Sequence, residues 1–177
     1  MRRYVQIPCM LLLILAAVPL AAEEPLSEHL APLAPFVGKT WRGEFANSTP
    51  EKPLVDVSRW ERALNGQAVR ILHSVNDGDY GGETLIVWDA ARQSLVYYYF
   101  TTAGFYTQGT VRLEGGKFLS HEVVSGNAEG VTEVEAVGEI LPDGRLRSTS
   151  RHLKNGQWVT GHEVVYREDP SARVVFR

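Results

Sequence analysis

From residue 39 onward, apolar and polar residues alternate along the chain, and clusters of turn residues interrupt the alternation at regular intervals. A period of two places successive side chains on opposite faces of the backbone, as a half-buried β-strand requires. The pattern predicts about ten strands. They fall at about residues 39–46, 54–64, 67–76, 82–89, 94–102, 105–113, 117–124, 131–140, 145–153 and 157–167.

The turns between these strands indicate how the strands are connected. Asn65-Gly66 and Asn155-Gly156 are dipeptides favoured in two-residue hairpins, because both residues tolerate a positive φ. Asp143-Gly144, Gly115-Gly116 and residues 77–82 supply similar turns. Short connections favour an antiparallel meander, which leaves two exposed edges unless it closes. We therefore expect an all-β, antiparallel up-and-down β-barrel of about ten strands, wide enough to leave an interior cavity.

A different pattern comes before the strands. Residues 1–22 join a basic start at Arg2-Arg3, an apolar run from Met10 to Val18 and a small pair, Ala21-Ala22. These are the three parts of a secretory signal peptide, and the run is shorter than the ~20 residues that a spanning helix needs. We expect cleavage after Ala22, a periplasmic or secreted location and no stable membrane span afterwards. Cys9 would leave with the signal, so the mature chain would have no disulfide.

Residues 23–38 are expected to form a short helix and a lead-in to the barrel. Leu26, Leu30 and Leu33 recur at helical spacing, Ser27 is a suitable cap, and two prolines keep the helix short. The barrel domain would then span residues 39–167, followed by a tail at 168–177.

Charge excludes one class of partner. The chain has 18 Lys and Arg against 21 Asp and Glu. Without the two arginines of the signal, 16 basic residues face 21 acidic ones, which is a net charge of −5. No basic stripe is present, so nucleic-acid binding is not expected.

The candidate ligand-binding residues are histidines and aromatic residues on apolar strand faces, which usually point into a barrel. The histidines are His73, His121 and His162, whereas His152 alternates with serines and is expected to be exposed. The aromatic candidates are Trp41, Tyr97, Tyr99, Phe105 and Trp158. The alternation leaves open whether Tyr97 and Tyr99, or Tyr98 and Phe100, face inward. A histidine satisfied by a core neighbour is the more common alternative to a ligand-binding one.

Motifs for catalysis or metal binding are absent from the sequence. It has no nucleophile elbow, no phosphate-binding glycine loop and no closely spaced histidine pair. Glu133, Glu135 and Glu139 alternate along one strand and are expected to face solvent. We therefore expect no resident metal, cofactor or enzymatic activity. An isomerase or hydrolase that uses a cavity histidine with help from Glu or Tyr is the weaker alternative.

Several segments resemble known barrel families. Residues 36–44, Phe-Val-Gly-Lys-Thr-Trp-Arg-Gly-Glu, resemble the opening strand of calycin-type barrels, the lipocalin and fatty-acid-binding group. Residues 64–89, 99–104 and 155–167 look like a bacterial family of uncharacterised lipocalin-like domains. The resemblance covers roughly Phe36 to Arg167 and implies the barrel fold, without implying an activity.

The nitrobindin-like haem barrels are a more distant resemblance. Those proteins bind haem through a histidine near their last strands, and His162 is the matching position here. Residues 45–48, Phe-Ala-Asn-Ser, replace the glycine- and tyrosine-rich segment that follows the opening strand in that family.

Three functions remain open at this stage. The first is binding of a small, mainly apolar molecule inside the barrel. The second is haem binding through His162. The third is an envelope interaction domain with a filled barrel, which would present the 77–82 loop and the C-terminal tail to a protein partner that the sequence does not identify.

Overall fold

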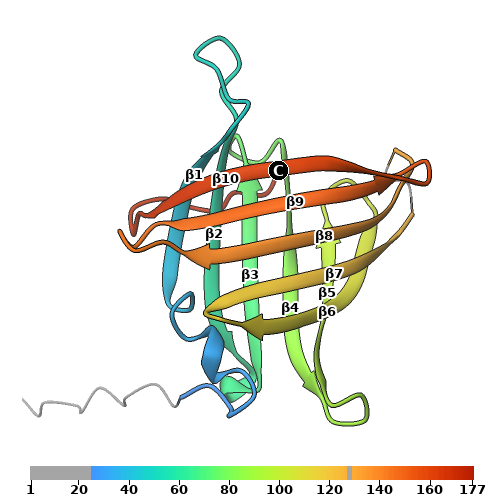
Figure 1. The fold of residues 1–177 in the computed structure, drawn as a ribbon. Helices are drawn as coiled ribbons and strands as arrows, with labels where there is room; N and C mark the ends of the chain where they lie inside the picture. The colour runs from blue at the N-terminus through green and yellow to red at the C-terminus, as the bar shows by residue number, and fades with distance from the viewer. Residues whose placement is uncertain (1–24, 127–128) are drawn as a thin grey trace, which may run out of the picture.

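The computed structural model describes residues 25–126 and 129–177, so the predicted signal peptide, residues 1–22, lies outside the described residues. Within them, ten antiparallel strands form a closed barrel (Figure 1). The strands are β1 (Lys39–Phe45), β2 (Val55–Ala63), β3 (Ala68–Val75), β4 (Tyr80–Asp89), β5 (Ser94–Thr101), β6 (Tyr106–Glu114), β7 (Lys117–Ser125), β8 (Val131–Ile140), β9 (Leu146–Lys154) and β10 (Gln157–Glu168).

Each strand pairs with the next along the chain, and β10 returns to pair with β1. The closing register runs from Trp41 opposite Glu168 to Phe45 opposite Val164. Closure satisfies the backbone groups that an open meander would expose at its two edges. The all-β up-and-down barrel predicted from the alternation is therefore confirmed.

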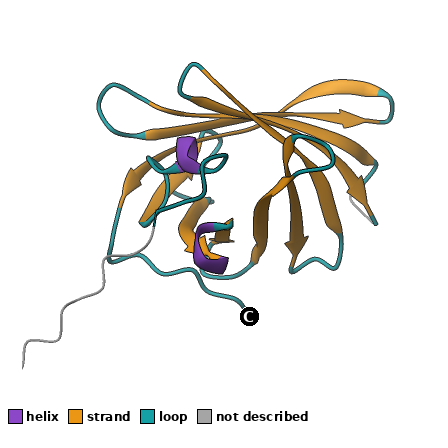
Figure 2. Cartoon of the chain, turned by 90° about the horizontal axis from the view of Figure 1, so that it is seen from below, coloured by secondary structure: helices purple, strands orange, loops and turns teal. Residues whose placement is uncertain are grey.

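The predicted N-terminal helix is shorter than expected. The structure has a single 3₁₀ turn, η1 (Ala31–Leu33), with Pro32 inside it and no side-chain cap. Leu30, Leu33 and Phe36 are buried nonetheless, because the segment folds over one end of the barrel. Figure 2 views the barrel from this end, with the helical turns among the strands.

Aromatic rings form the core at this closed end. The Phe36 ring stacks on Trp60, with ring centroids 5.2 Å apart, and meets the edge of Phe118 at 5.5 Å. Trp41 is completely buried, and its indole N–H donates a 3.3 Å hydrogen bond to the carbonyl of Phe36. We call Phe36, Trp41, Trp60 and Phe118 the aromatic plug. Burial of such side chains is worth about 1.5–3 kcal/mol each, so the plug stabilises the fold as well as closing the barrel.

The C-terminal tail packs on the barrel. The Asp169 amide donates to the Thr40 carbonyl at 2.8 Å, and the Val175 amide donates to the Ser74 hydroxyl at 3.0 Å. Arg177 then pairs with Asp79 at 3.6 Å. Ser74 points away from the interior and is only 2% exposed. The tail therefore covers the outer face of β3 and contacts the 77–82 loop.

No helix in residues 25–126 or 129–177 is long and apolar enough to cross a membrane.

Candidate functional site

A cavity of about 1130 Å³ occupies the barrel interior above the aromatic plug. Leu33, Trp60 and Phe118 line it at the closed end. At the other end, loop residues such as Asn47 and Ala103 contribute to its wall. The cavity therefore extends from a closed apolar floor to the loops of the far end.

The alternation of β5 decides which aromatic residues face this cavity. Tyr97 and Tyr99 line it, whereas Tyr98 and Phe100 project outward and are 44% and 55% exposed. Tyr97 belongs to the cluster of buried apolar residues that includes Leu33 and Trp60, and Tyr99 packs against that cluster. The alternative that the sequence left open is thus resolved in favour of Tyr97 and Tyr99.

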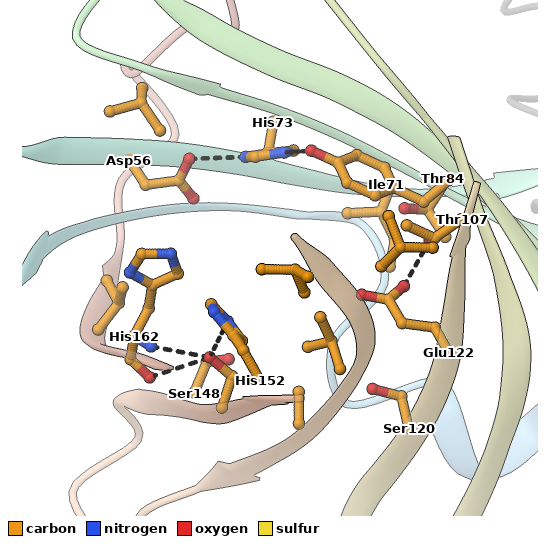
Figure 3. A pocket seen from close by; sticks show the side chains of 18 of the residues that line it. Asp56, Ile71, His73, Thr84, Thr107, Ser120, Glu122, Ser148, His152 and His162 are labelled. Atoms are coloured by element: carbon orange, nitrogen blue, oxygen red, sulfur yellow. Dashed lines mark hydrogen bonds and ion pairs between the residues drawn. The ribbon is translucent and has the colours of Figure 1, made fainter. Parts of the chain in front are cut away.

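A chain of polar side chains runs along one wall, across β2, β3, β4 and β5. Asp56 Oδ1 lies 2.8 Å from His73 Nδ1, and His73 Nε2 lies 2.7 Å from the Tyr99 hydroxyl. The Tyr99 and Tyr80 hydroxyls are 2.9 Å apart. Figure 3 shows Asp56 beside His73, with the imidazole between the carboxylate and a phenol.

A third phenol anchors the start of this chain. The Tyr166 hydroxyl of β10 donates to Asp56 Oδ2 at 2.9 Å. Burial, and then the charge of Asp56, raise the pKa of Tyr166 well above its usual value. Burial likewise raises the pKa of Tyr99 far above the usual phenol range. These phenols therefore keep their protons at neutral pH.

Glu122 of β7 forms a separate polar group on another part of the wall. Its Oε2 accepts hydrogen bonds from the Tyr97 hydroxyl at 2.9 Å and from the Thr107 hydroxyl at 2.5 Å. Burial raises the pKa of the Glu122 carboxyl, and the two hydrogen bonds offset only part of that effect. Figure 3 shows Glu122 and Thr107 side by side on the wall.

A pair of imidazoles lies nearer the open end. The ring centroids of His152 and His162 are 5.2 Å apart. The ring of Phe45 packs edge-to-face against His162, with the two centroids 5.4 Å apart. Burial lowers the pKa of both imidazoles, so the neutral forms are favoured.

A β-bulge directs His162 into the cavity. The register between β10 and β9 shifts between Thr160 and Glu163, so two residues, Gly161 and His162, lie opposite Ser150. The His162 amide donates to the Ser150 hydroxyl at 2.8 Å. A Cβ at Gly161 would lie 2.4 Å from that hydroxyl oxygen and 2.6 Å from His152 Nε2, so a larger residue here would require these two side chains to shift.

Five of the eight sequence-predicted site residues line the cavity: His73, Tyr97, Tyr99, Phe105 and His162. Three do not. Trp41 is inside the barrel but belongs to the plug, below the cavity. The other two, His121 and Trp158, lie on the outer surface.

The inward orientation expected for His121 is wrong. Its side chain is 49% exposed and pairs with Glu133 at 2.8 Å. The inward series on β7 is instead Phe118, Ser120, Glu122 and Val124. The error arose because β7 carries apolar residues on both faces, so hydrophobicity did not distinguish inside from outside.

Trp158 was expected on the same face as His162, and the bulge explains why it is not. The extra residue reverses the alternation between them, and Trp158 lies outside, 39% exposed, with Arg151 4.6 Å over its ring. His152 was expected to be exposed but lines the cavity, because β9 points its serines and this histidine inward.

Several cavity residues that take part in the polar networks were not expected from the sequence, among them Asp56, Tyr80, Glu122 and Tyr166. Asp56 lies between two valines in a strand, and an acid flanked by β-branched residues in this way is a signal for a buried carboxylate. Glu122 alternates with Phe118 and Val124, which is a similar signal.

No group of three or more His, Cys, Asp or Glu side chains able to hold a metal ion occurs in the described part of the chain.

Comparisons with known proteins identify a fold relative. No family model matches the chain, and no curated protein does. The crystal structure of Rv2717c from M. tuberculosis is similar, with a TM-score of 0.60 and 16% sequence identity over 81% of this chain and 99% of that one. At this identity the similarity shows a shared barrel fold and nothing further.

Proposed function

We propose that this protein is a lipocalin-like binding protein that holds one small, mainly apolar molecule inside its barrel. The observation that carries the proposal is the cavity of about 1130 Å³, which has an apolar floor and walls that combine apolar side chains with groups of polar ones. Small-molecule sites usually have this composition, in which apolar surface supplies affinity and a few polar groups fix orientation.

The hypothesis of an envelope interaction domain assumed a filled barrel. A cavity of this size argues against that assumption. In addition, the tail and the 77–82 loop, which were its expected contacts, contact each other through Arg177 and Asp79. We therefore favour ligand binding, in the periplasm or after secretion if the predicted signal is cleaved.

Protein purified from its own host should carry the ligand. Native mass spectrometry would reveal a mass above that of the mature chain, and solvent extraction would release the molecule for identification. Ala136 of β8 lines the cavity and its neighbour Val137 does not. The Ala136→Trp variant should therefore lose the added mass, whereas Val137→Trp should retain it. An unliganded wild type, or equal occupancy in both variants, would contradict the proposal.

Haem binding through His162 is a second candidate. His162 lines the cavity and its pKa is lowered by burial, so a neutral imidazole is available as an axial ligand. Within the described residues, its ring nitrogens make no hydrogen bond. Haem would supply an iron centre for electron transfer or for binding of a small gas molecule.

The haem hypothesis is tested by adding hemin to the mature protein and recording the Soret band. His162→Ala should abolish the band if His162 is the ligand, and His152→Ala provides the matched control. A band that does not respond to His162→Ala would reject this assignment.

A further inference from the structure

Glu122 has one carboxylate oxygen that the protein does not use. The hydroxyls of Tyr97 and Thr107 both donate to Oε2. Oε1 accepts no hydrogen bond from residues 25–126 or 129–177. In Figure 3 the oxygen of Glu122 that is not bonded to Thr107 points toward the interior of the barrel. The side chain therefore offers a free acceptor to a molecule in the cavity.

The register of three strands holds the carboxylate in this orientation. Tyr97 of β5 lies opposite Gly109 of β6, which in turn lies opposite Glu122 of β7. A Cβ at Gly109 would lie 2.9 Å from the Cβ of Glu122, so the glycine leaves room at this position. The phenol of Tyr97 can therefore cross β6 and reach the carboxylate. Donors from two strands thus fix Oε2 and leave Oε1 facing inward.

The charge of Glu122 has no cationic partner in the described part of the chain. Its two hydrogen-bond donors are neutral hydroxyls, and it forms no ion pair there. Asp56, the carboxylate of the other polar chain, instead lies 2.8 Å from an imidazole nitrogen of His73. Buried carboxylates are usually paired, because an unpaired charge in apolar surroundings costs free energy. A cation on the ligand would supply the missing partner.

The lining of the cavity also favours a cation with an apolar body. The aromatic residues Tyr97, Tyr99, Phe105 and Phe118 line it, and the faces of aromatic rings attract ammonium groups. The apolar floor would accept the rest of such a molecule. Charge and aromatic surface therefore both favour an ammonium group over a neutral hydroxyl.

We propose that the ligand is a mainly apolar primary amine, bound as its ammonium ion with Glu122 as the counter-ion. This inference rests on the proposed ligand-binding function and names the class of its ligand. Glu122 Oε1 accepts a hydrogen bond from the ammonium group, and Tyr97 and Thr107 position the carboxylate.

The ion pair makes binding depend on pH. Burial raises the pKa of Glu122, whereas an ammonium group beside it favours the ionised form. Below that raised pKa, the carboxyl must release a proton when the amine binds. Affinity for the amine should thus fall by up to about tenfold per pH unit as the pH drops below the pKa of Glu122. An alkylamine keeps its own proton in this range, because the pKa of an alkylammonium group is about 10.

Other titratable groups share the cavity with Glu122. They are the phenols of Tyr80, Tyr97, Tyr99 and Tyr166, the imidazoles of His73, His152 and His162, the carboxylates of Asp56 and Glu129, and the ammonium of Lys154. His121, on the outer face of β7, lowers the pKa of Glu122. The residues of β6 and β8 beside Glu122, Thr107 and Val134, do not titrate. Glu122→Gln keeps all of these groups, so comparison with wild type isolates the contribution of Glu122.

Two matched probes test the selection: 2-(aminomethyl)naphthalene and 2-(hydroxymethyl)naphthalene, which differ only in the ammonium or hydroxyl group. Titration calorimetry of the wild type at about pH 7.5 should show the amine binding about tenfold more tightly, because a close charge pair adds to the hydrogen bond that either probe can donate. The ratio of the two affinities should decrease as the pH is lowered to about 5.

Substitutions identify the residue responsible. In Glu122→Gln the amide oxygen accepts from Tyr97 and Thr107, so the amide nitrogen replaces Oε1 and the charge is lost. This variant should bind the alcohol more tightly than the amine, and the ratio should lose most of its pH dependence. Glu114→Gln makes the same chemical change at an exposed position on β6, where Glu114 pairs with Arg112, and should leave the ratio unchanged.

Circular dichroism would confirm that each variant is folded. The pH dependence of the wild-type ratio tests the inference even if Glu122→Gln is not folded, because a ratio that stays constant between about pH 5 and 7.5 would overturn it.

The outcomes distinguish this inference from the function on which it rests. Saturable binding of both probes, with the alcohol as tight as the amine or tighter at about pH 7.5, would overturn the selection of an amine and leave the apolar cavity supported. A preference for the amine that survives in folded Glu122→Gln would overturn the role of Glu122. Absence of saturable binding for both probes would contradict the ligand-binding function and the amine class together.

Discussion

Substitution of Glu122 tests the description of the cavity wall. Both of its hydrogen bonds, from Tyr97 and from Thr107, end on a single oxygen, Oε2. In Glu122→Gln the amide oxygen can accept both bonds, whereas Glu122→Leu keeps a similar volume and removes the acceptor. Glutamine should therefore be tolerated and leucine should not.

The magnitude follows from the burial of the two donors. Tyr97 and Thr107 are only 6% and 2% exposed, so their hydroxyls have little access to bulk water. An unsatisfied buried donor costs about 1–3 kcal/mol, and rotation of the threonine hydroxyl recovers part of that cost. We expect Glu122→Leu to lower the free energy of unfolding by about 2–4 kcal/mol at neutral pH.

The Glu122→Gln comparison also has a defined pH dependence. Burial raises the pKa of Glu122, so the folded protein holds this proton more tightly than the unfolded chain does. The resulting stabilisation is fully present below the unfolded pKa of about 4.3 and is lost as the pH rises through the folded pKa. Glu122→Gln should thus gain stability relative to wild type as the pH is raised from about 4 to 8.

Urea unfolding followed by tryptophan fluorescence at several pH values measures both effects. Subtraction of the Glu122→Gln curve from the wild-type curve removes the contributions of all other titrating groups. If Gln and Leu destabilise the protein equally, or if the wild-type and Gln curves stay parallel across this pH range, the assignment of Glu122 as a buried, hydrogen-bonded carboxyl is refuted.

Three further predictions concern other parts of the barrel. Asp56→Ala should lower the free energy of unfolding by about 2–4 kcal/mol, because His73 and the buried Tyr166 lose their acceptor; a thermal melt unchanged from wild type would contradict this. Gly161→Ala should cost about 1–3 kcal/mol, since its Cβ would lie 2.4 Å from the Ser150 hydroxyl oxygen; chemical denaturation measures the loss, and a variant as stable as wild type would argue against the bulge. Deletion of residues 171–177 should expose the outer face of β3, so hydrogen–deuterium exchange should accelerate in residues 68–75 and stay unchanged in β7. If the deletion changes the exchange rates of the two strands equally, the tail does not cover β3.

The strands and turns could be predicted because each depends on local sequence. Alternation defines a strand within a few residues, and Asn155-Gly156 adopts the positive φ angles, 52° and 78°, for which that dipeptide is selected. Closure followed from the energetic cost of two open edges. The N-terminal helix was the local exception, because helical spacing over so few residues does not outweigh the prolines within them.

The polar networks could not be predicted because they depend on contacts between distant residues. Asp56 and His73 are 17 residues apart, and His73 and Tyr99 are 26 apart, so the register of three strand pairings brings them together. The bulge at Gly161-His162 similarly has no signature in the alternation, although it determines that His162 points inward while Trp158 does not. Local patterns determined which segments are strands, and the register determined which side chains meet.

The central claim is that an apolar molecule binds inside the barrel, and fluorescence titration with the neutral probe N-phenyl-1-naphthylamine tests it most directly. We predict saturable, one-to-one binding with increased emission for the wild type and for Val137→Trp, and loss of that binding for Ala136→Trp, in which the indole occupies the cavity. Binding that is equal in the two tryptophan variants, or that does not saturate in the wild type, would contradict the claim.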